Sequence, residues 1–185
     1  MTSKAGGGGH LGKGHHQGVT HADVPADQYY AQLARARRGA GALITTTDGR
    51  IVMIDTTYRD FYEIPGGAVE AGESAPDACA RECREELGIE VPIGRLLSID
   101  HQSDGGDLGD SIMFVYDGGT MTPEMPADRN TDSEVAAIVL VELADLDVVT
   151  IPRLANRIRG ALAARENGTV HEAVNGRPRP ASDRT

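Results

Sequence analysis

Three glutamates, Glu82, Glu85 and Glu86, stand within five positions of one another near the middle of the chain. If this stretch is helical, at about 100° per residue, Glu86 lies about 40° to one side of Glu82 and Glu85 about 60° to the other. The three carboxylates then share one face of the helix. An apolar stripe adjoins that face, formed by Cys79, Cys83 and Leu87.

Placing three carboxylates on one helix face is energetically unfavourable. Like charges three or four positions apart destabilise a helix by about 0.2–0.5 kcal/mol per pair, and a position beside the core adds a desolvation penalty. Arg81 can pair with Glu85, which leaves Glu82 and Glu86 without a protein cation on that face. Mg²⁺ takes oxygen ligands and is commonly held by one or two carboxylates. On charge spacing alone, however, a solvated acidic helix face is the better interpretation.

The sequence around the glutamates predicts where this helix begins and ends. Ser74 and Asp77 fit a capping box, and Pro76 is tolerated in a first helical turn. Gly88 readily adopts the left-handed conformation that ends a helix. A helix is therefore expected over residues 75–87. Its two cysteines are four positions apart, a spacing that suits neither a disulfide nor a metal or redox motif, so we interpret them as core residues.

Strand patterns surround this helix. Asp48-Gly49 predicts a hairpin that joins strands 41–46 and 51–56. A brief strand before Pro65 and further strands over 93–102, 111–119 and 134–143 are expected. Apolar residues at helical spacing predict a last helix from about 151, with arginines on its other face. A short leading helix is expected within residues 26–38.

Composition limits the class of protein. The chain has 185 residues, of which 39% are hydrophobic, which favours a single domain. A formal charge of −10 argues against an extended nucleic-acid surface. No apolar run of about 18 residues and no apolar leader segment is found, so we expect no membrane partner and a cytoplasmic location. Residues 1–24 are Gly- and His-rich and are predicted to be a disordered tail. A domain over 25–166 and a polar tail over 167–185 complete the expected organisation.

The stretch that contains the glutamates closely resembles the signature of the Nudix hydrolase family, of the kind found in MutT-like and ADP-ribose pyrophosphatase-like proteins. The matching positions are Gly67, Glu73, Arg81-Glu82-Cys83, Glu85-Glu86 and Gly88-Ile89. Every fixed position is filled, and the one mild departure is Cys83, where a larger aliphatic residue is usual. The resemblance extends to "YEIPGG" before the signature and to the order of strands over about 38–165. This resemblance therefore favours a functional site over the interpretation of the glutamates as a solvated acidic helix face.

The resemblance implies a fold and a set of roles. The fold is α+β, a three-layer α/β/α sandwich with a mixed sheet. Metal oxygens, for Mg²⁺ or for Mn²⁺ as a substitute, would come from Glu82, Glu85, Glu86 and the carbonyl of Gly66. Arg81 would orient Glu85, and Glu73 would brace the loop. The implied activity is hydrolysis of the pyrophosphate bond in a nucleoside diphosphate linked to another moiety, such as ADP-ribose, a nucleotide sugar or a nucleoside triphosphate.

The general base is not specified by the signature. Glu134, which opens the strand expected over 134–143, is the first candidate, because several family members carry a glutamate at that place. Glu85 is an alternative. Aspartates of the loop after residue 102 could serve instead, and these are Asp104, Asp107 and Asp110. A solvated turn is the better interpretation of that loop.

Few side chains can stack on a nucleobase, since the chain holds five tyrosines, two phenylalanines and no tryptophan. Tyr58, Phe61 and Tyr62 cluster just ahead of the signature and are the candidate substrate-binding residues. For the arginines of the last helix, Arg153, Arg157 and Arg159, a solvated face is favoured over contact with phosphates. The sequence does not separate the substrate classes.

Two other classes of function remain open. Some proteins similar to this family bind nucleotides or ADP-ribose as sensing modules without hydrolysing them. Such modules commonly lose signature carboxylates, whereas this signature is complete. A second relative, an isomerase of isoprenoid diphosphates, departs from the full signature. A small-molecule nucleotide is the expected partner in the favoured interpretation, and a homodimer is compatible with the sequence.

Overall fold

The computed structural model describes residues 24–103, 109–124 and 133–179. The chain divides into two compact units, residues 1–34 and residues 35–185. The described part of the first unit contains the helix α1 (Ala26–Gln32), which lies within the range 26–38 where a short helix is expected. The second unit begins ten residues later than the expected domain boundary at 25. The predicted Gly- and His-rich tail lies outside the described residues, except for its last residue.

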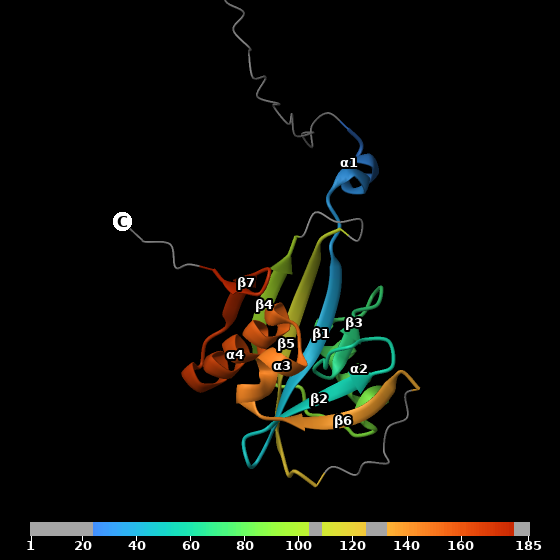
Figure 1. Cartoon of the computed structure of the whole chain (residues 1–185). Coiled ribbons are helices and arrows are strands. Elements are labelled where there is room, and N and C mark those ends of the chain that lie inside the picture. The colour runs from blue at the N-terminus through green and yellow to red at the C-terminus, as the bar shows by residue number, and fades with distance from the viewer. Residues whose placement is uncertain (1–23, 104–108, 125–132, 180–185) are drawn as a thin grey trace, which may run out of the picture. The chain divides into compact units, whose positions relative to one another are not determined.

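An eight-stranded sheet forms the middle of the second unit (Figure 1). Its strands are β1 (Arg37–Thr46), β2 (Ile51–Thr56), β3 (Gly66–Ala68), β4 (Leu96–Gln102), β5 (Ser111–Met121), β6 (Val135–Val141), β7 (His171–Val174) and β8 (Arg177–Pro178). The order across the sheet is β6-β2-β1-β5-β4-β7-β8, and β3 pairs with β1. The β1–β5 and β4–β7 pairs are parallel and the others are antiparallel. The sheet is therefore mixed, as expected.

Helices cover both faces of this sheet. The helices of the second unit are α2 (Ala75–Leu87), the 3₁₀ turn η1 (Leu143–Asp145), α3 (Leu146–Val149) and α4 (Pro152–Asn167). The α2 helix packs in one core with residues such as Ala42, and α4 packs in a second core with residues such as Leu43. Successive residues of a strand point to opposite faces, so one strand supplies both cores. The expected α+β fold with three layers is confirmed.

The α2 helix has the bounds that its sequence predicts. The Ser74 hydroxyl accepts a hydrogen bond from the Asp77 amide nitrogen at 3.4 Å, and Pro76 lies in the first turn. Gly88 ends the helix in the left-handed region, with φ of 65°. Both cysteines are fully buried in the core beneath α2, which confirms their interpretation as core residues.

The C-terminal segment differs from the polar tail expected over 167–185. Residues of this segment form β7, which pairs in parallel with β4, and β8, which pairs with β7. Ala173 is fully buried. The prediction of a polar tail is therefore wrong for the described residues up to 179. A strand of four residues within a polar, Pro-containing sequence has too little periodicity to be recognised. The open edge of β4, far away in the sequence, provides its hydrogen-bonding partner.

Candidate active site

The three glutamates of α2 differ in how far each is removed from water. Glu86 is buried, with 7% of the residue exposed. The Glu82 side chain is 17% exposed and that of Glu85 is 49% exposed. The shared helix face predicted from the spacing therefore runs from the protein interior at Glu86 to solvent at Glu85.

Arg81 joins the loop before α2 to the carboxylates on the helix. Its Nε and Nη2 atoms donate to the two Glu73 oxygens at 3.0 and 3.1 Å. Its Nη1 atom donates to Glu82 at 2.8 Å and to Glu85 at 3.1 Å. Nη2 also donates to the carbonyl of Ala68 at 3.1 Å. The expectation that Glu82 lacks a nearby protein cation is wrong, because the guanidinium fork reaches both glutamates.

The glycines of β3 bring the backbone against the same helix face. The Gly66 amide nitrogen donates to Oε2 of Glu86 at 2.7 Å, and Gly66 has φ of 145°, a conformation that favours glycine. A Cβ atom on Gly67 would lie only 2.5 Å from Cδ of Glu82. Backbone atoms of β1 exclude a side chain at position 66, and a side chain at position 67 would displace the Glu82 carboxylate, so the backbone of β3 lies directly beside two of the carboxylates.

The oxygen donors at this site fit a hard divalent cation in their chemistry. Burial raises the pKa of Glu82, and the hydrogen bond from Arg81 opposes this only in part. An ionised carboxylate held away from water gains most from a cation. Within the described residues, no three acidic, His or Cys side chains converge as a ready metal cluster, and Arg81 draws Glu82 and Glu85 toward itself. The metal roles of Glu82, Glu85, Glu86 and Gly66 stay predictions.

Glu134, the first candidate for the general base, directly precedes β6, which pairs with β2. Its carbonyl accepts a hydrogen bond from the Thr57 amide nitrogen at 2.8 Å, just before β6 begins. Burial raises the pKa of the neighbouring Tyr58, and the charges of Glu134 and Glu86 raise it further. Of the alternative aspartates, Asp104 and Asp107 lie outside the described residues.

The three candidate stacking residues separate in the structure. Tyr58 and Phe61 line a cavity, and the guanidinium of Arg59 lies 5.6 and 5.7 Å from their ring centroids. Tyr62 does not line that cavity and instead packs, partly buried, against the core beneath α4. We therefore leave Tyr62 out of the substrate surface, because its ring contributes to the core.

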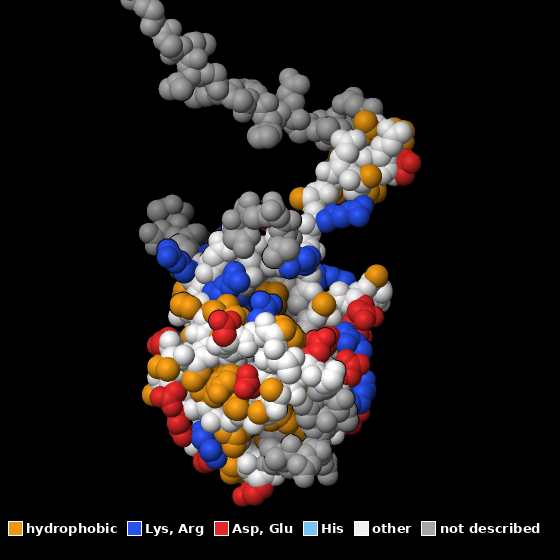
Figure 2. All heavy atoms as spheres, turned by 45° about the vertical axis from the view of Figure 1, so that its right-hand side comes forward, with side chains coloured by type: hydrophobic (Ala, Val, Ile, Leu, Met, Phe, Trp, Pro, Cys, Tyr) orange, Lys and Arg blue, Asp and Glu red, His pale blue; other side chains and the backbone are white. Residues whose placement is uncertain are grey.

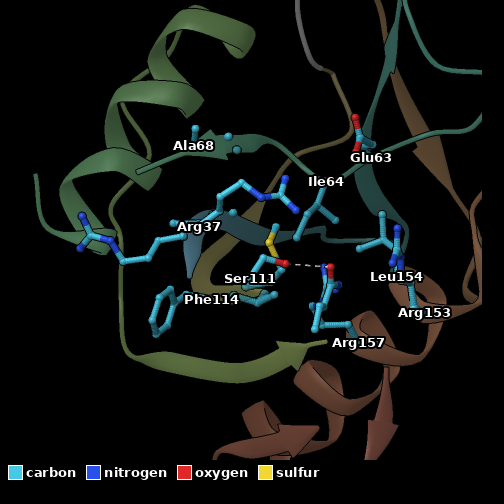
Figure 3. Close-up of a pocket in the computed structure, with 18 of the residues that line it drawn as sticks. Arg37, Glu63, Ile64, Ala68, Ser111, Phe114, Arg153, Leu154 and Arg157 are labelled. Carbon is cyan, nitrogen blue, oxygen red and sulfur yellow. Dashed lines mark hydrogen bonds between the residues drawn. The ribbon is translucent and has the colours of Figure 1, made fainter. Parts of the chain in front are cut away.

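This cavity has a volume of about 560 Å³, within the usual range of about 300–1,000 Å³ for ligand pockets (Figure 3). One wall is made by the backbone of β3, including Gly66 and Gly67, which also contact the α2 carboxylates. Other parts of the lining come from β1, β5 and the first turns of α4. The carboxylates and the cavity therefore share one wall and form a single candidate site.

The arginines of this cavity were not recognised as site residues from the sequence. Arg153 and Arg157 of α4 both line it, and Arg157 is buried rather than solvated. Its Nη2 atom donates to Oδ2 of the fully buried Asp100 at 2.8 Å. A signal was present, since Arg157 is three positions after Leu154 and four before Ala161, both of which are buried.

Comparison with known proteins places this site in a family. The family model described as NUDIX domain matches residues 35–164. This range covers most of the chain and contains β1 to β6, α2 and most of α4. The chain therefore belongs to the NUDIX domain family.

Individual relatives agree with this assignment. An ADP-ribose pyrophosphatase from Methanocaldococcus jannaschii is 32% identical over 79 residues, 40% of this chain and 47% of that protein. A MutT-like protein from Streptomyces ambofaciens is 27% identical over 56% of this chain and 73% of its own length. The solved MutT protein from Methanosarcina mazei Go1 has a TM-score of 0.56 at 25% identity, over 72% and 96% of the two chains. The match to the first relative spans less than half of its length, so its activity is not transferred directly.

None of the helices within the described ranges 24–103, 109–124 and 133–179 combines the length and the apolar character needed to cross a bilayer.

Proposed function

We propose that this chain is a Mg²⁺-dependent hydrolase that cleaves the pyrophosphate bond of a nucleoside diphosphate linked to another moiety. The observation that carries the proposal is the wall shared between the α2 carboxylates and a cavity of about 560 Å³. A cavity of this size accommodates a nucleotide, and Gly66 and Gly67 both line it and contact the carboxylates. Relatives named as pyrophosphatases, such as the M. jannaschii protein, support the reaction class.

Each residue of the proposed site would have its own role. Glu82, Glu85, Glu86 and the carbonyl of Gly66 would hold Mg²⁺, or Mn²⁺ in its place. The ion, when bound, neutralises phosphate oxygens and polarises the attacking water. Arg81 holds Glu82 and Glu85 in place through its hydrogen bonds.

Three further residues complete this assignment. Glu73 fixes Arg81 from the loop before the helix. Glu134 would take the proton of the attacking water on a carboxylate oxygen, and Glu85 is the alternative base. Tyr58 and Phe61 would stack on the nucleobase, since both rings line the cavity.

The test is a substrate panel with the purified full chain and millimolar Mg²⁺. ADP-ribose, nucleotide sugars, NADH, dinucleoside polyphosphates and nucleoside triphosphates are incubated, and the products are separated by chromatography. We expect cleavage of one class at the pyrophosphate bond. An isomerase would leave that bond intact. Binding of a nucleotide without any turnover across the panel would favour the sensing module instead.

The metal assignment is tested by Glu86→Gln. This change keeps the shape of the side chain and an acceptor for the Gly66 amide but removes the charge, so metal-dependent turnover should be abolished while the fold is retained. Glu90→Gln is the matched control, because Glu90 is exposed and pairs with Arg84 at 3.4 Å. The control should stay within about threefold of the unchanged protein, in line with the small energies of exposed ion pairs. An active Glu86→Gln protein would remove Glu86 from the metal site.

The cytoplasmic location and the homodimer also stay proposals. Cell fractionation tests the first, and sedimentation velocity of the purified chain tests the second.

A further inference from the structure

A row of three polar side chains crosses the sheet on the cavity side. Gln102 of β4 pairs with Ser111 of β5, and Ser111 pairs with Arg37 of β1, so the three lie side by side on adjacent strands. All three line the cavity. The Ser111 hydroxyl donates to Oε1 of Gln102 at 3.2 Å, as the dashed line in Figure 3 marks. The row offers hydrogen-bond donors to whatever occupies this end of the cavity.

The one buried acid beside this row is already satisfied. Asp100 accepts hydrogen bonds from Arg157 at 2.8 and 3.3 Å, from the Gly176 amide nitrogen at 3.0 Å and from the Gln102 amide at 3.3 Å. Its negative charge is therefore compensated mainly by Arg157. Asp100 is not available to neutralise a further guanidinium.

Positive charge exceeds negative charge in the lining of the cavity, although the chain carries a net charge of −10. The basic residues of the lining are Arg37, Arg38, Arg59, Arg153 and Arg157, and its one acidic residue is Glu63. Figure 2 shows several arginines across the upper part of the folded unit, next to apolar side chains. The lining of the cavity is therefore mainly basic, whereas the carboxylate face of α2 is acidic.

Three of these arginines form no ion pair within the part of the chain that the structure describes, and one of them, Arg38, donates to the carbonyl of Glu70 at 3.2 Å. Arg59 lies 3.8 Å from Glu63, and Arg157 pairs with Asp100. Arg37 and Arg153 appear in none of the ion pairs between described residues, and both are exposed. In Figure 3 Arg37 reaches over the cavity from β1, and Arg153 flanks it from α4.

An anionic group of the ligand is the partner that fits these two arginines. The scissile pyrophosphate belongs beside the α2 carboxylates, where a metal ion would compensate its charge. Arg37 and Arg153 do not belong to that helix or to β3. A guanidinium fork matches the oxygen geometry of a phosphate and binds it through two parallel hydrogen bonds.

We propose that Arg37 and Arg153 bind a second phosphate group, carried on the substrate apart from the pyrophosphate that is cleaved. This inference rests on the proposed function for the identity of the reaction, and it narrows the substrate to nucleotides that bear an additional phosphate on the sugar. The Gln102 amide, which uses one of its two hydrogens on Asp100, supplies a further donor beside Arg37. Substrates without this group would not make the proposed contact with Arg37 and Arg153.

The test compares ligands that differ by one phosphate, without metal and without turnover. Calorimetry on the full chain measures the affinities of AMP, adenosine 2′,5′-bisphosphate and adenosine 3′,5′-bisphosphate. At least one bisphosphate should bind about 10-fold or more tightly than AMP, because its added phosphate gains charge-assisted hydrogen bonds from the guanidiniums. Arg37→Gln and Arg153→Gln should each reduce this ratio at least threefold, and the double variant should bring it close to one.

Arg159→Gln is the matched control. Arg159 belongs to the same helix as Arg153, but it pairs with Asp147 at 2.8 Å and does not line the cavity. This variant should keep the full preference for the bisphosphate. Equal affinities for AMP and both bisphosphates, no measurable binding of either bisphosphate, or a preference that survives the double variant would overturn the inference.

The binding preference for a bisphosphate can be measured separately from the proposed hydrolase activity. Glu86→Gln should lose turnover but keep the preference for a bisphosphate, because Glu86 lies on α2 rather than among the arginines. A chain that hydrolyses nucleotides without this preference would lose only the inference about the second phosphate. A chain with the preference but without turnover on phosphorylated substrates would lose only the proposed reaction.

Discussion

At the scale of single residues, Arg81 donates hydrogen bonds to two carboxylates, Glu73 and Glu82, whose pKa values are shifted in opposite directions. Its hydrogen bonds hold the pKa of Glu73 below the ordinary value for a glutamate. The pKa of Glu82 is raised in spite of the same guanidinium, because burial is the larger effect there. Burial therefore opposes the ionisation of Glu82, whereas the hydrogen bonds from Arg81 favour the ionisation of Glu73.

Glu134 is the residue whose role can be tested most directly by substitution. General base catalysis contributes about 10²–10⁴-fold to rates, so Glu134→Gln should lower turnover by about 10²-fold or more. Initial rates at saturating substrate and Mg²⁺ measure this. Asp110→Asn serves as the comparison, since Asp110 is an exposed aspartate from the alternative loop. A loss below about threefold in Glu134→Gln would exclude Glu134 as the base, and a large loss in Asp110→Asn would transfer the role to that loop.

At the scale of elements, the contact between α4 and β7 depends on the absence of one side chain. Gly160 is in the interior of α4, where glycine is about 1 kcal/mol less favourable than alanine. A Cβ atom there would lie 2.3–2.5 Å from the ring atoms of His171 on β7. The Nε2 atom of His171 is buried without a hydrogen-bond partner among the described residues. Close packing of the helix on this strand is the reason that the glycine is tolerated.

Gly160→Ala should therefore destabilise the protein in spite of the better helix propensity of alanine. Overpacking costs about 1–3 kcal/mol, which exceeds the gain of about 1 kcal/mol, so we expect a net loss of about 1 kcal/mol. Urea unfolding followed by circular dichroism gives the free energy of unfolding. In a His171→Ala background the ring is absent, and the same change at position 160 should become neutral or stabilising. An effect of the same sign and size in both backgrounds would contradict the packing explanation.

At the scale of the whole molecule, the buried pair of Asp100 and Arg157 connects three parts of the fold. Asp100 is on β4, Arg157 is on α4, and the Gly176 amide nitrogen that also donates to Asp100 is in the turn between β7 and β8. The Asp100 side chain is fully buried and that of Arg157 is 7% exposed. The pair holds the C-terminal strands and the last helix in register with the sheet, at one end of the cavity.

Arg157→Met should cost about 3–5 kcal/mol in the free energy of unfolding, because it leaves the Asp100 carboxylate buried without a cation. The double variant Asp100→Asn with Arg157→Met removes both charges and should recover most of that loss. Guanidinium chloride unfolding of the full chain measures both. If Arg157→Met alone cost less than about 1 kcal/mol, or if the double variant were no more stable than Arg157→Met, the pair would not have the connecting role that its burial indicates.

The sequence by itself determined the parts of this protein that depend on neighbours along the chain. The bounds of α2 follow from Ser74 and Gly88, and the shared face of its glutamates follows from helical spacing. The hairpin turn at Gly49, with φ of 91°, also depends only on residues that are neighbours along the chain. These features could be predicted because the atoms that stabilise them lie within a few residues of one another.

Only the tertiary structure decided the features that depend on distant segments. Arg157 is buried because Asp100 lies opposite it, 57 positions away in sequence. Tyr62 belongs to the core rather than to the cavity, and β7 exists because β4 offers it an edge. Pairing across a sheet also assembles Arg37, Ser111 and Gln102 into one row. Such contacts have no period in the sequence, because burial and charge compensation depend on which surfaces meet after folding.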